Sequence, residues 1–403
     1  VFEFYPTSKF VFIELAVESG KGGRRRLGQC DELEDQSGSG ELPKAIFNVS
    51  SLVIFDLGYN EIEGSLPKDV CSLLSSLELF RLYSNRVSGE MPSPLSSCSS
   101  LQILDFLLNS FTGSIPGDIW NVSTLQELYL RRNNLVGTIP PPTSNMSMLT
   151  MLYIGDNNYD GRILQELGNL FNLEGLGISS SNLVGSIPEL IFNISSLQSI
   201  IFTNNRLMGH LPSSMGLGLP NLETLFLGRN ELSGIIPSSI SNSTRLSRIG
   251  LSENLFTDNV PSSFGELPKS IFNITLLATI NLPYNKVTGS LPSDFCYSLP
   301  RLKVLSLTSN QLNGELPPSM SPYKSLEILS ISINKFIGSK PRDIGNLSML
   351  QVSFLCMNEL SGKIPSSISN SSKLAKIDFF NNFLTGNVPT TFGKLKFPSP
   401  KNK

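Results

Sequence analysis

One pattern, L-x-x-L-x-L-x-x-N-x-L-x-G-x-I-P, recurs along most of this chain of 403 residues. Its copies follow one another at intervals of 24 or 25 residues, with a single interval of 31 between Leu246 and Leu277. A repeat of this length predicts a stack of similar coils, because neighbouring coils bury the apolar face that one coil cannot bury alone. The fourteen copies begin at Leu52, Leu77, Leu101, Leu125, Leu149, Leu173, Leu197, Leu222, Leu246, Leu277, Leu302, Leu326, Leu350 and Leu374.

The alternation of leucines inside each copy predicts a short β-strand. In the segment LYLRRNNLVGTIP at 128–140, Leu128 and Leu130 are two residues apart, so both side chains lie on the same face of a strand. We expect these leucines to enter the core, and the strands of successive coils to form one parallel sheet. The glycine that follows tolerates backbone conformations that other residues avoid, and the proline closes the segment where no ladder N–H is needed.

An asparagine occupies the ninth position of thirteen copies, and Ser181 is the exception. The amide both donates and accepts hydrogen bonds, so it can satisfy backbone groups where the chain turns away from the sheet inside the stack. We therefore predict a structural asparagine ladder. Its members are Asn60, Asn85, Asn109, Asn133, Asn157, Asn205, Asn230, Asn254, Asn285, Asn310, Asn334, Asn358 and Asn382.

The L-x-G-x-I-P end of the pattern resembles the plant-specific subclass of leucine-rich repeats, over about residues 40 to 395. This resemblance implies an α/β-type repeat solenoid, a right-handed superhelix of 14 coils of about 24 residues with a parallel sheet on its concave face. The segments IFNVSSL (46–52), IFNISSL (191–197) and LPSSMGLGLPNLETL (211–225) are similar to the extracellular regions of plant leucine-rich-repeat receptor-like serine/threonine kinases, a group that includes immune pattern-recognition receptors.

That resemblance implies a ligand-recognising ectodomain at the plant cell surface, in defence or developmental signalling, as part of a larger receptor. The implied partners are a peptide, a protein or a microbial-pattern ligand, together with a co-receptor that itself carries leucine-rich repeats. Two alternatives stay open. One is a secreted enzyme inhibitor similar to polygalacturonase-inhibiting proteins, which share the repeat, and the other is a truncated gene product with no function of its own.

The sequence argues against catalysis by this chain. A kinase needs a glycine-rich loop, a strand lysine, an H-R-D loop and a D-F-G motif, and none of these is present. His210 is the only histidine and no cysteine cluster has zinc-ligand spacing, so we expect no catalytic residue, metal or cofactor. A formal net charge of −2 gives no reason to expect nucleic acid as a partner. We find no signal peptide and no run of about 18 apolar residues, so we expect no direct membrane insertion.

Two related blocks divide the chain. GELPKAIFNVSSL, which ends at Leu52, returns as GELPKSIFNITLL, which ends at Leu277, and the likeness continues at a constant offset of 225. The first residues do not resemble the paired-cysteine cap that is usual in the family. The predicted divisions are a disordered N-terminal segment (1–39), a first repeat block (40–264), a second, partly duplicated block (265–395) and a tail (396–403).

The strand residues between the ladder leucines point to the concave side and form the candidate ligand site. Tyrosine and arginine, which dominate binding hot spots, gather there in the first five coils. After Leu277 the same positions become bland, with Thr279, Ser306 and Thr308 among them. We predict that ligand contact concentrates on coils two to five. The candidate ligand residues are Tyr59, Arg81, Tyr83, Tyr129, Arg131, Arg132, Tyr153, Asp156, Phe226 and Arg229, with Ile201 beside the last two.

Eight N-x-S/T motifs all lie four residues before the first leucine of a coil. They are predicted to be N-glycosylation sites on an exposed rim. The other interpretation is a turn that the repeat prefers, because asparagine and serine side chains stabilise turns. The motifs begin at Asn48, Asn121, Asn145, Asn193, Asn242, Asn273, Asn346 and Asn370.

Five cysteines make an odd count that cannot pair completely within the chain. Cys71 and Cys98 fall at similar phases of adjacent coils, so a disulfide between them is geometrically conceivable. We favour the interpretation that they are small, buried, unpaired hydrophobes, as free cysteine often is.

Overall fold

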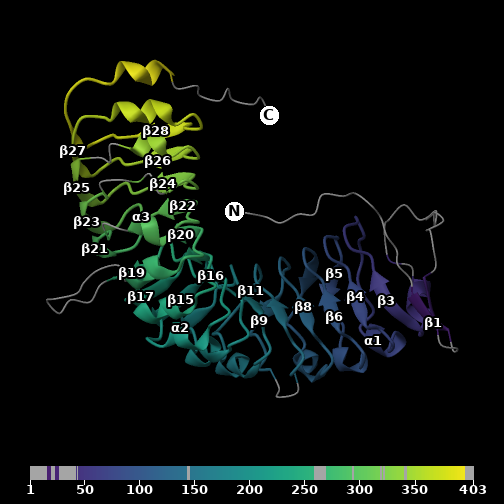
Figure 1. The fold of residues 1–403 in the computed structure, drawn as a ribbon. Helices are drawn as coiled ribbons and strands as arrows, with labels where there is room; N and C mark the ends of the chain where they lie inside the picture. The colour runs from purple at the N-terminus through teal and green to yellow at the C-terminus, as the bar shows by residue number, and fades with distance from the viewer. Residues whose placement is uncertain are drawn as a thin grey trace. The chain divides into compact units, whose positions relative to one another are not determined.

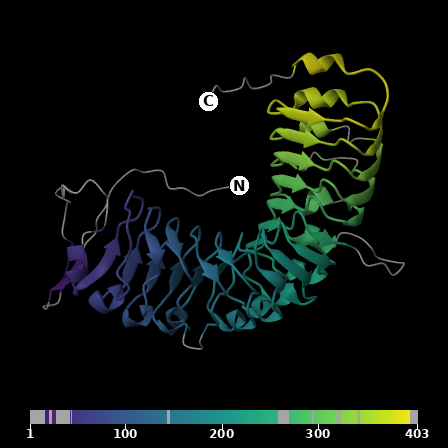
Figure 2. The same ribbon diagram turned by 180° about the vertical axis from the view of Figure 1, so that it is seen from behind.

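The computed structural model describes residues 16–19, 23–26, 42, 44–142, 146–257, 269–292, 295–317, 320, 323–339 and 343–394. The chain forms two compact units, Val1–Leu183 and Val184–Lys403. Each unit is a stack of coils, and each coil contributes one strand to a long parallel sheet (Figures 1 and 2).

In the first unit the strands of successive coils pair in register. Leu104 lies beside Leu128, and Leu128 beside Leu152, so the same phase of each coil is aligned across the sheet. Two antiparallel strands from the N-terminal segment extend the sheet beyond the first coil. The order is β2 (Gly23–Arg26), β1 (Ala16–Ser19), β3 (Leu52–Asp56), β4 (Leu79–Arg81), β6 (Ile103–Asp105), β8 (Glu127–Tyr129), β10 (Met151–Tyr153) and β12 (Gly175–Gly177).

The second unit repeats the arrangement with the same in-register pairing, for example Leu225 beside Ile249. The order is β14 (Ser199–Ile201), β16 (Thr224–Phe226), β18 (Arg248–Gly250), β20 (Thr279–Asn281), β22 (Val304–Ser306), β24 (Ile328–Ser330), β26 (Val352–Phe354) and β28 (Lys376–Asp378). The predicted fold class is therefore confirmed, with one parallel strand in each of the fourteen coils of the described chain.

Short parallel sheets form where the chain leaves the main sheet, at the L-x-G part of the repeat. In the first unit they are β5 (Ser88–Glu90) with β7 (Ser110–Thr112), and β9 (Val136–Gly137) with β11 (Asn158–Tyr159). In the second unit they are β13 (Val184–Ser186), β15 (Arg206–His210), β17 (Glu231–Gly234) and β19 (Leu255–Phe256), and then β21 (Thr288–Ser290), β23 (Gln311–Glu315), β25 (Lys335–Ser339), β27 (Glu359–Gly362) and β29 (Phe383–Leu384).

The return segments are short helices, most of them 3-10 helices that follow the proline of the repeat. Pro116, Pro188 and Pro237 each stand in extended conformation directly before one, since the ring fixes φ near the value that the next turn needs. The helices are η1 (Lys44–Asn48), α1 (Val70–Leu73), η2 (Leu95–Ser97), η3 (Gly117–Asn121), η4 (Gln165–Asn169), η5 (Glu189–Asn193), α2 (Met215–Gly218), η6 (Ser238–Asn242), η7 (Lys269–Asn273), α3 (Phe295–Ser298), η8 (Ile344–Asn346), η9 (Ser366–Asn370) and η10 (Thr390–Lys394).

The core is a ladder of apolar side chains between the strands and the return helices. Leu128 and Leu130 are 0% and 1% exposed, as the alternation predicts. In the first coils phenylalanine rings replace some leucines and contact one another from coil to coil: the Phe55 ring stacks on Phe80 at 5.3 Å, and Phe80 meets Phe106 edge to face at 4.9 Å. Burial of such rings and leucines contributes roughly 1.5–3 kcal/mol per side chain.

The asparagine side chains tie consecutive coils together, and Asn133 illustrates the arrangement. Its Nδ2 donates to the carbonyl of Leu130 in its own coil at 3.1 Å and to the carbonyl of Phe106 in the preceding coil at 2.8 Å. Its Oδ1 accepts the backbone N–H of Phe111, also in the preceding coil, at 3.0 Å. The same bonds recur at Asn157, whereas the Ser181 hydroxyl donates within its own coil to Ser179.

The residue before each ladder asparagine adopts a left-handed backbone. Arg132 and Asp156 have φ of 58° and 53°, and Tyr59 has φ of 60°. This conformation turns the chain out of the sheet and points the backbone N–H at the next coil, where Arg132 donates to Gly155 at 3.0 Å. Non-glycine residues pay about 1–2 kcal/mol for it, so the conformation persists only because the stack holds it.

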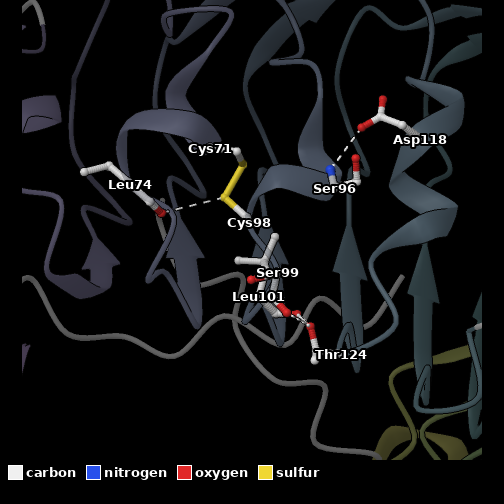
Figure 3. The surroundings of a disulfide bond; sticks show 8 residues. All are labelled: Cys71, Leu74, Ser96, Cys98, Ser99, Leu101, Asp118 and Thr124. Atoms are coloured by element: carbon white, nitrogen blue, oxygen red, sulfur yellow. Dashed lines mark hydrogen bonds between the residues drawn. A yellow bond between two sulfur atoms is a disulfide. The ribbon is translucent and has the colours of Figure 1, made fainter.

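A disulfide joins Cys71 of α1 to Cys98, which follows η2 (Figure 3). The two Cα atoms lie 4.8 Å apart, and both side chains are at most 1% exposed. Our interpretation of these cysteines as unpaired is wrong, because two coils in register bring the same phase of each within bonding distance. Cys356 is free, Cys30 lies outside the described residues, and so does the side chain of Cys296.

The predicted domain divisions stay predictions. The boundary at 264/265 lies within 258–268, outside the described residues, as do the tail and all of 1–39 except β1 and β2. The division between the two compact units falls elsewhere in the sequence, between Leu183 and Val184.

We predict that Asn133→Ala lowers the free energy of unfolding by about 2 kcal/mol or more. The change leaves the Phe111 N–H and two backbone carbonyls in the core without the hydrogen bonds that the amide makes to them. Urea denaturation followed by circular dichroism measures the loss. The control is Asn134→Ala at the next position, where the side chain is exposed. An equal loss in both variants would contradict a structural role for the amide.

Candidate functional site

The solvent-facing side of the first unit's sheet carries a row of polar and aromatic side chains. Asp56, Arg81, Asp105, Tyr129 and Tyr153 each end a strand, and each pairs in register with the next. We call these five residues the strand-end row. Because their backbones are fixed by the sheet, their side chains stand side by side about one strand spacing, roughly 4.8 Å, apart.

Eight of the ten predicted ligand residues lie on the first unit, around this row. Three of them belong to it, Tyr83 and Arg131 follow strands β4 and β8 by two residues, and Tyr59, Arg132 and Asp156 occupy the left-handed turns. The other two, Phe226 and Arg229, belong to the second unit with Ile201. The predicted ligand residues of coils one to five therefore lie together on the first unit, and Phe226 and Arg229 belong to the second.

Two arginines converge on one carboxylate at the edge of the row. The Arg131 Nε donates to Asp156 Oδ2, and the Arg132 Nε lies 3.8 Å from the same oxygen. The side chains of both arginines are more than a third exposed, so the pairs add little stability. At the other end of the row Arg81 pairs with Asp56 at 3.7 Å.

Tyr129 and Tyr153, the last two residues of the strand-end row, form a stacked pair. Their ring centroids are 5.8 Å apart and their planes differ by 8°. Both rings are half-buried. We call this pair the aromatic shelf.

The shelf rests on a strand without side chains on that face. A Cβ at Gly177 would lie 2.4 Å from Tyr153 Cδ1, and a Cβ at Gly175 would lie 2.5 Å from the Tyr153 hydroxyl. The ring of Tyr153 therefore leans across β12 into space that only glycine leaves open. Our sequence analysis missed both glycines, although glycine at two solvent-facing positions of one strand is a signal for close approach.

Asp105, in the centre of the strand-end row, is a third residue that we did not predict from the sequence. Burial raises its pKa to about 6, and the neighbouring carboxylates of Asp56 and Glu127 act in the same direction. The Leu107 N–H, which donates to Oδ1 at 3.1 Å, and the charge of Arg81 oppose that rise only in part. The centre of the surface therefore holds a carboxylate that is costly to charge.

The same burial and acidic charge also raise the pKa values of the adjacent tyrosines, Tyr129 and Tyr83. Burial, followed by the charge and the hydrogen bond of Glu127, raises the pKa of Tyr129 above its ordinary value. Burial and the charge of Asp56 raise the pKa of Tyr83. Both phenols are therefore neutral hydrogen-bonding groups at physiological pH.

The second unit has its own smaller features. Arg229 pairs with Glu253 at 2.9 Å, and both line a shallow pocket of about 560 Å³ with Leu255 and Tyr284. Phe226 leans over Gly250, as Tyr153 leans over β12. The later coils expose more large apolar side chains than we expected from the sequence, because Ile333, Met357 and Phe380 are 43%, 40% and 66% exposed.

Seven of the eight N-x-S/T motifs lie in described parts of the chain, and Asn145 lies outside them. In each of the seven both the asparagine and the hydroxyl residue two positions later are exposed. The asparagine ends the return helix in every case, on the side of the coil away from the main sheet. The asparagines are Asn48, Asn121, Asn193, Asn242, Asn273, Asn346 and Asn370.

Among the described residues, no three or more histidine, cysteine or carboxylate side chains are grouped so that they could hold a metal ion. No helix in the same part of the chain is long and apolar enough to cross a membrane. His210 lies on β15, where its Nδ1 is 3.2 Å from the Ser233 hydroxyl.

Comparison with known families identifies the repeat. The family described as "Leucine rich repeat" matches residues 195–256, and the one described as "Leucine Rich Repeat" matches 124–146 and 301–322. The LRR receptor-like serine/threonine-protein kinase GSO2 of Arabidopsis thaliana is 36% identical over 76 residues, which are 19% of this chain and 6% of that protein. The predicted likeness to receptor-like kinases is confirmed for the repeat region.

Solved structures extend the likeness over most of the chain. The ectodomain of the receptor kinase GASSHO1/SCHENGEN3 from Arabidopsis thaliana, in complex with CASPARIAN STRIP INTEGRITY FACTOR 2, has a TM-score of 0.81 and 34% identity and covers 88% of this chain. The chain spans 41% of that ectodomain. The Arabidopsis receptor kinase HAESA, in complex with the peptide hormone IDA and the co-receptor SERK1, has a TM-score of 0.57 and 28% identity over 88% of this chain and 71% of its own.

We predict that the stability of the protein falls as the pH rises from about 4 to 6. The unfolded Asp105 loses its proton near pH 3.8, whereas the folded one keeps it until about pH 6, so the native state binds more protons in this window. Asp105→Asn removes the penalty and stabilises the fold at pH 7 by on the order of 2 kcal/mol. Urea unfolding of both proteins across this range measures the difference, which should vanish below pH 4. If the free energies of unfolding of the two proteins changed with pH in parallel, the raised pKa of Asp105 would be refuted.

Proposed function

We propose that this chain, a leucine-rich-repeat protein homologous to the repeat regions of plant receptor-like kinases, recognises a peptide or protein ligand on the main sheet of its first unit. The observation that carries the proposal is the strand-end row, in which five polar or aromatic side chains stand in register on consecutive strands. An extended ligand that crosses the strands would meet one such side chain per coil.

The residue types on this surface suit binding. Tyrosine and arginine supply most hot-spot energy in protein interfaces, and here they stand on a rigid sheet, so little side-chain freedom remains to be lost. The exposed guanidinium groups of Arg131 and Arg132 offer hydrogen-bond donors to an anionic group of the ligand, and the aromatic shelf offers a flat apolar contact.

The relatives support the same function. GASSHO1/SCHENGEN3 and HAESA were each solved with a bound factor or peptide hormone, and HAESA also with a co-receptor. By this likeness the chain binds rather than catalyses, acts outside the cell, and signals by joining a leucine-rich-repeat co-receptor. The exposed N-x-S/T motifs fit a secreted surface.

We predict that the combined change of Arg81, Tyr129, Arg131 and Tyr153 to alanine abolishes ligand binding. Peptides selected from a random phage library against the wild-type chain should lose at least about 30-fold in affinity, because each hot spot contributes about 2 kcal/mol or more. Surface plasmon resonance measures the affinities. Asn281→Ala with Ser306→Ala is the control and should leave affinity unchanged, because these residues end β20 and β22 in the second unit as Arg81 and Tyr129 end their strands in the first. Unchanged affinity in the quadruple variant would remove the site from this surface.

We also predict that the exposed N-x-S/T asparagines carry glycans when the chain passes through a secretory pathway. Intact mass spectrometry before and after a peptide N-glycosidase should show the loss, and Asn121→Gln or Asn193→Gln should each remove one glycan. Asn169→Gln is the control, since Asn169 is exposed at the same phase of its coil but precedes Leu-Phe. Unmodified peptides at both sites would leave the motifs as turns of the repeat.

A further inference from the structure

We propose that the aromatic shelf and the carboxylates beside it form a subsite for a guanidinium group, the side chain of an arginine in the ligand. The subsite rests on the proposed function and specifies its chemistry: one anchor of the peptide is cationic and planar.

The shape of the shelf suits a planar cation. Tyr153 leans over Gly175 and Gly177, and Tyr129 lies parallel to it within 8°, so two rings of the same orientation span three strands. Side chains on β12 would displace the ring, and both positions are glycine. A planar aromatic surface of this kind attracts cations electrostatically, and it stacks guanidinium better than it holds an ammonium.

The charges next to the shelf also favour a cation. Asp56 and Glu127 each lie close enough to Asp105 to disfavour its ionisation, and Arg81 is the one cation among the groups that act on Asp105. The Arg81 guanidinium lies nearest to Asp56, at 3.7 Å. Among the four residues Asp56, Asp105, Glu127 and Arg81, the acidic groups outnumber the basic one by two.

Asp105 is oriented for a ligand. Its Oδ1 accepts the Leu107 N–H, which fixes the carboxylate, and it stands directly beside Tyr129 in the sheet. Glu127, two residues before Tyr129 on β8, accepts a hydrogen bond from the Tyr129 hydroxyl. A guanidinium over the shelf could donate its parallel N–H groups to these carboxylates while it contacts the ring, which a compact, strongly hydrated ammonium does less well. A neutral sugar ring could stack on the tyrosines but would leave the carboxylates uncompensated.

Charge linkage follows from this geometry. The groups that face Asp105 are Asp56 from β3, Arg81 and Tyr83 from β4 and its turn, and Glu127 and Tyr129 from β8. Since a bound cation favours the ionised carboxylate, a guanidinium ligand releases a proton from Asp105 below pH 6, and its affinity rises between pH 5 and pH 7.

The test uses N-acetyl-arginine methylamide as the probe and saturation-transfer NMR on the full chain. The probe should bind with a Kd in the millimolar range, at least about tenfold more tightly than the citrulline analogue, which has the same shape without the charge, and more tightly than the lysine analogue. Asp105→Asn should weaken binding about tenfold and abolish its pH dependence. Gly177→Ala should also weaken it, because the new Cβ displaces Tyr153 while the strand remains.

The matched control is Asp378→Asn. Asp378 occupies the same position of β28, and its Oδ1 accepts the Phe380 N–H as Asp105 accepts that of Leu107, but it belongs to the second unit. This variant should bind the probe like the wild type. Equal binding of arginine and citrulline, unchanged binding in Asp105→Asn, or no saturable binding would each overturn the subsite. Binding of methyl glucoside that ignores Asp105→Asn would instead identify a carbohydrate shelf.

The outcomes separate this inference from the proposed function. If selected peptides depend on the strand-end row but the arginine probe fails, the guanidinium subsite is wrong and the ligand surface stands. If neither binds there, the ligand surface itself is refuted.

Discussion

The buried asparagine amide is the interaction on which the rest of the structure depends. An amide such as that of Asn133 makes hydrogen bonds to its own coil and to the coil before it, so it fixes the rotation of one coil relative to the next. A sheet of short strands would otherwise have little to set its register. Because Asn133 and its equivalents remove that freedom, side chains 24 residues apart in sequence stand next to one another in space.

The same amide positions part of the proposed ligand surface. The turn that it stabilises requires a left-handed residue directly before it, and Arg132 and Asp156 occupy that position. Their backbones accept a strained conformation, and their side chains meet beyond the end of the strands. The charged residues at these positions are therefore held in place by their own backbone hydrogen bonds and by those of the neighbouring amide.

The surface itself combines two opposed features. The two phenol rings of the aromatic shelf are neutral. They lie parallel because the glycines of β12 leave room for the ring of Tyr153. Beside it Asp105 is partly desolvated by the same close neighbours that align the row. Desolvation disfavours the ionised carboxylate in the free protein, whereas a cation beside it favours that form. The contacts that bury Asp105 would therefore also favour the proposed pairing with a cationic ligand group.

The sequence by itself determined the fold, the number of coils and the residues that face solvent, because the spacing of leucines and the bonding capacity of asparagine are properties of a single coil. It also named Tyr129, Tyr153 and Arg131 as surface residues from strand alternation alone. Only the tertiary structure decided how neighbouring coils meet. The Cys71–Cys98 bond, the lean of Tyr153 onto Gly177 and the desolvation of Asp105 each depend on the distance between side chains of different coils. A pattern within one coil carries no information on that distance, which the stacking of the coils sets.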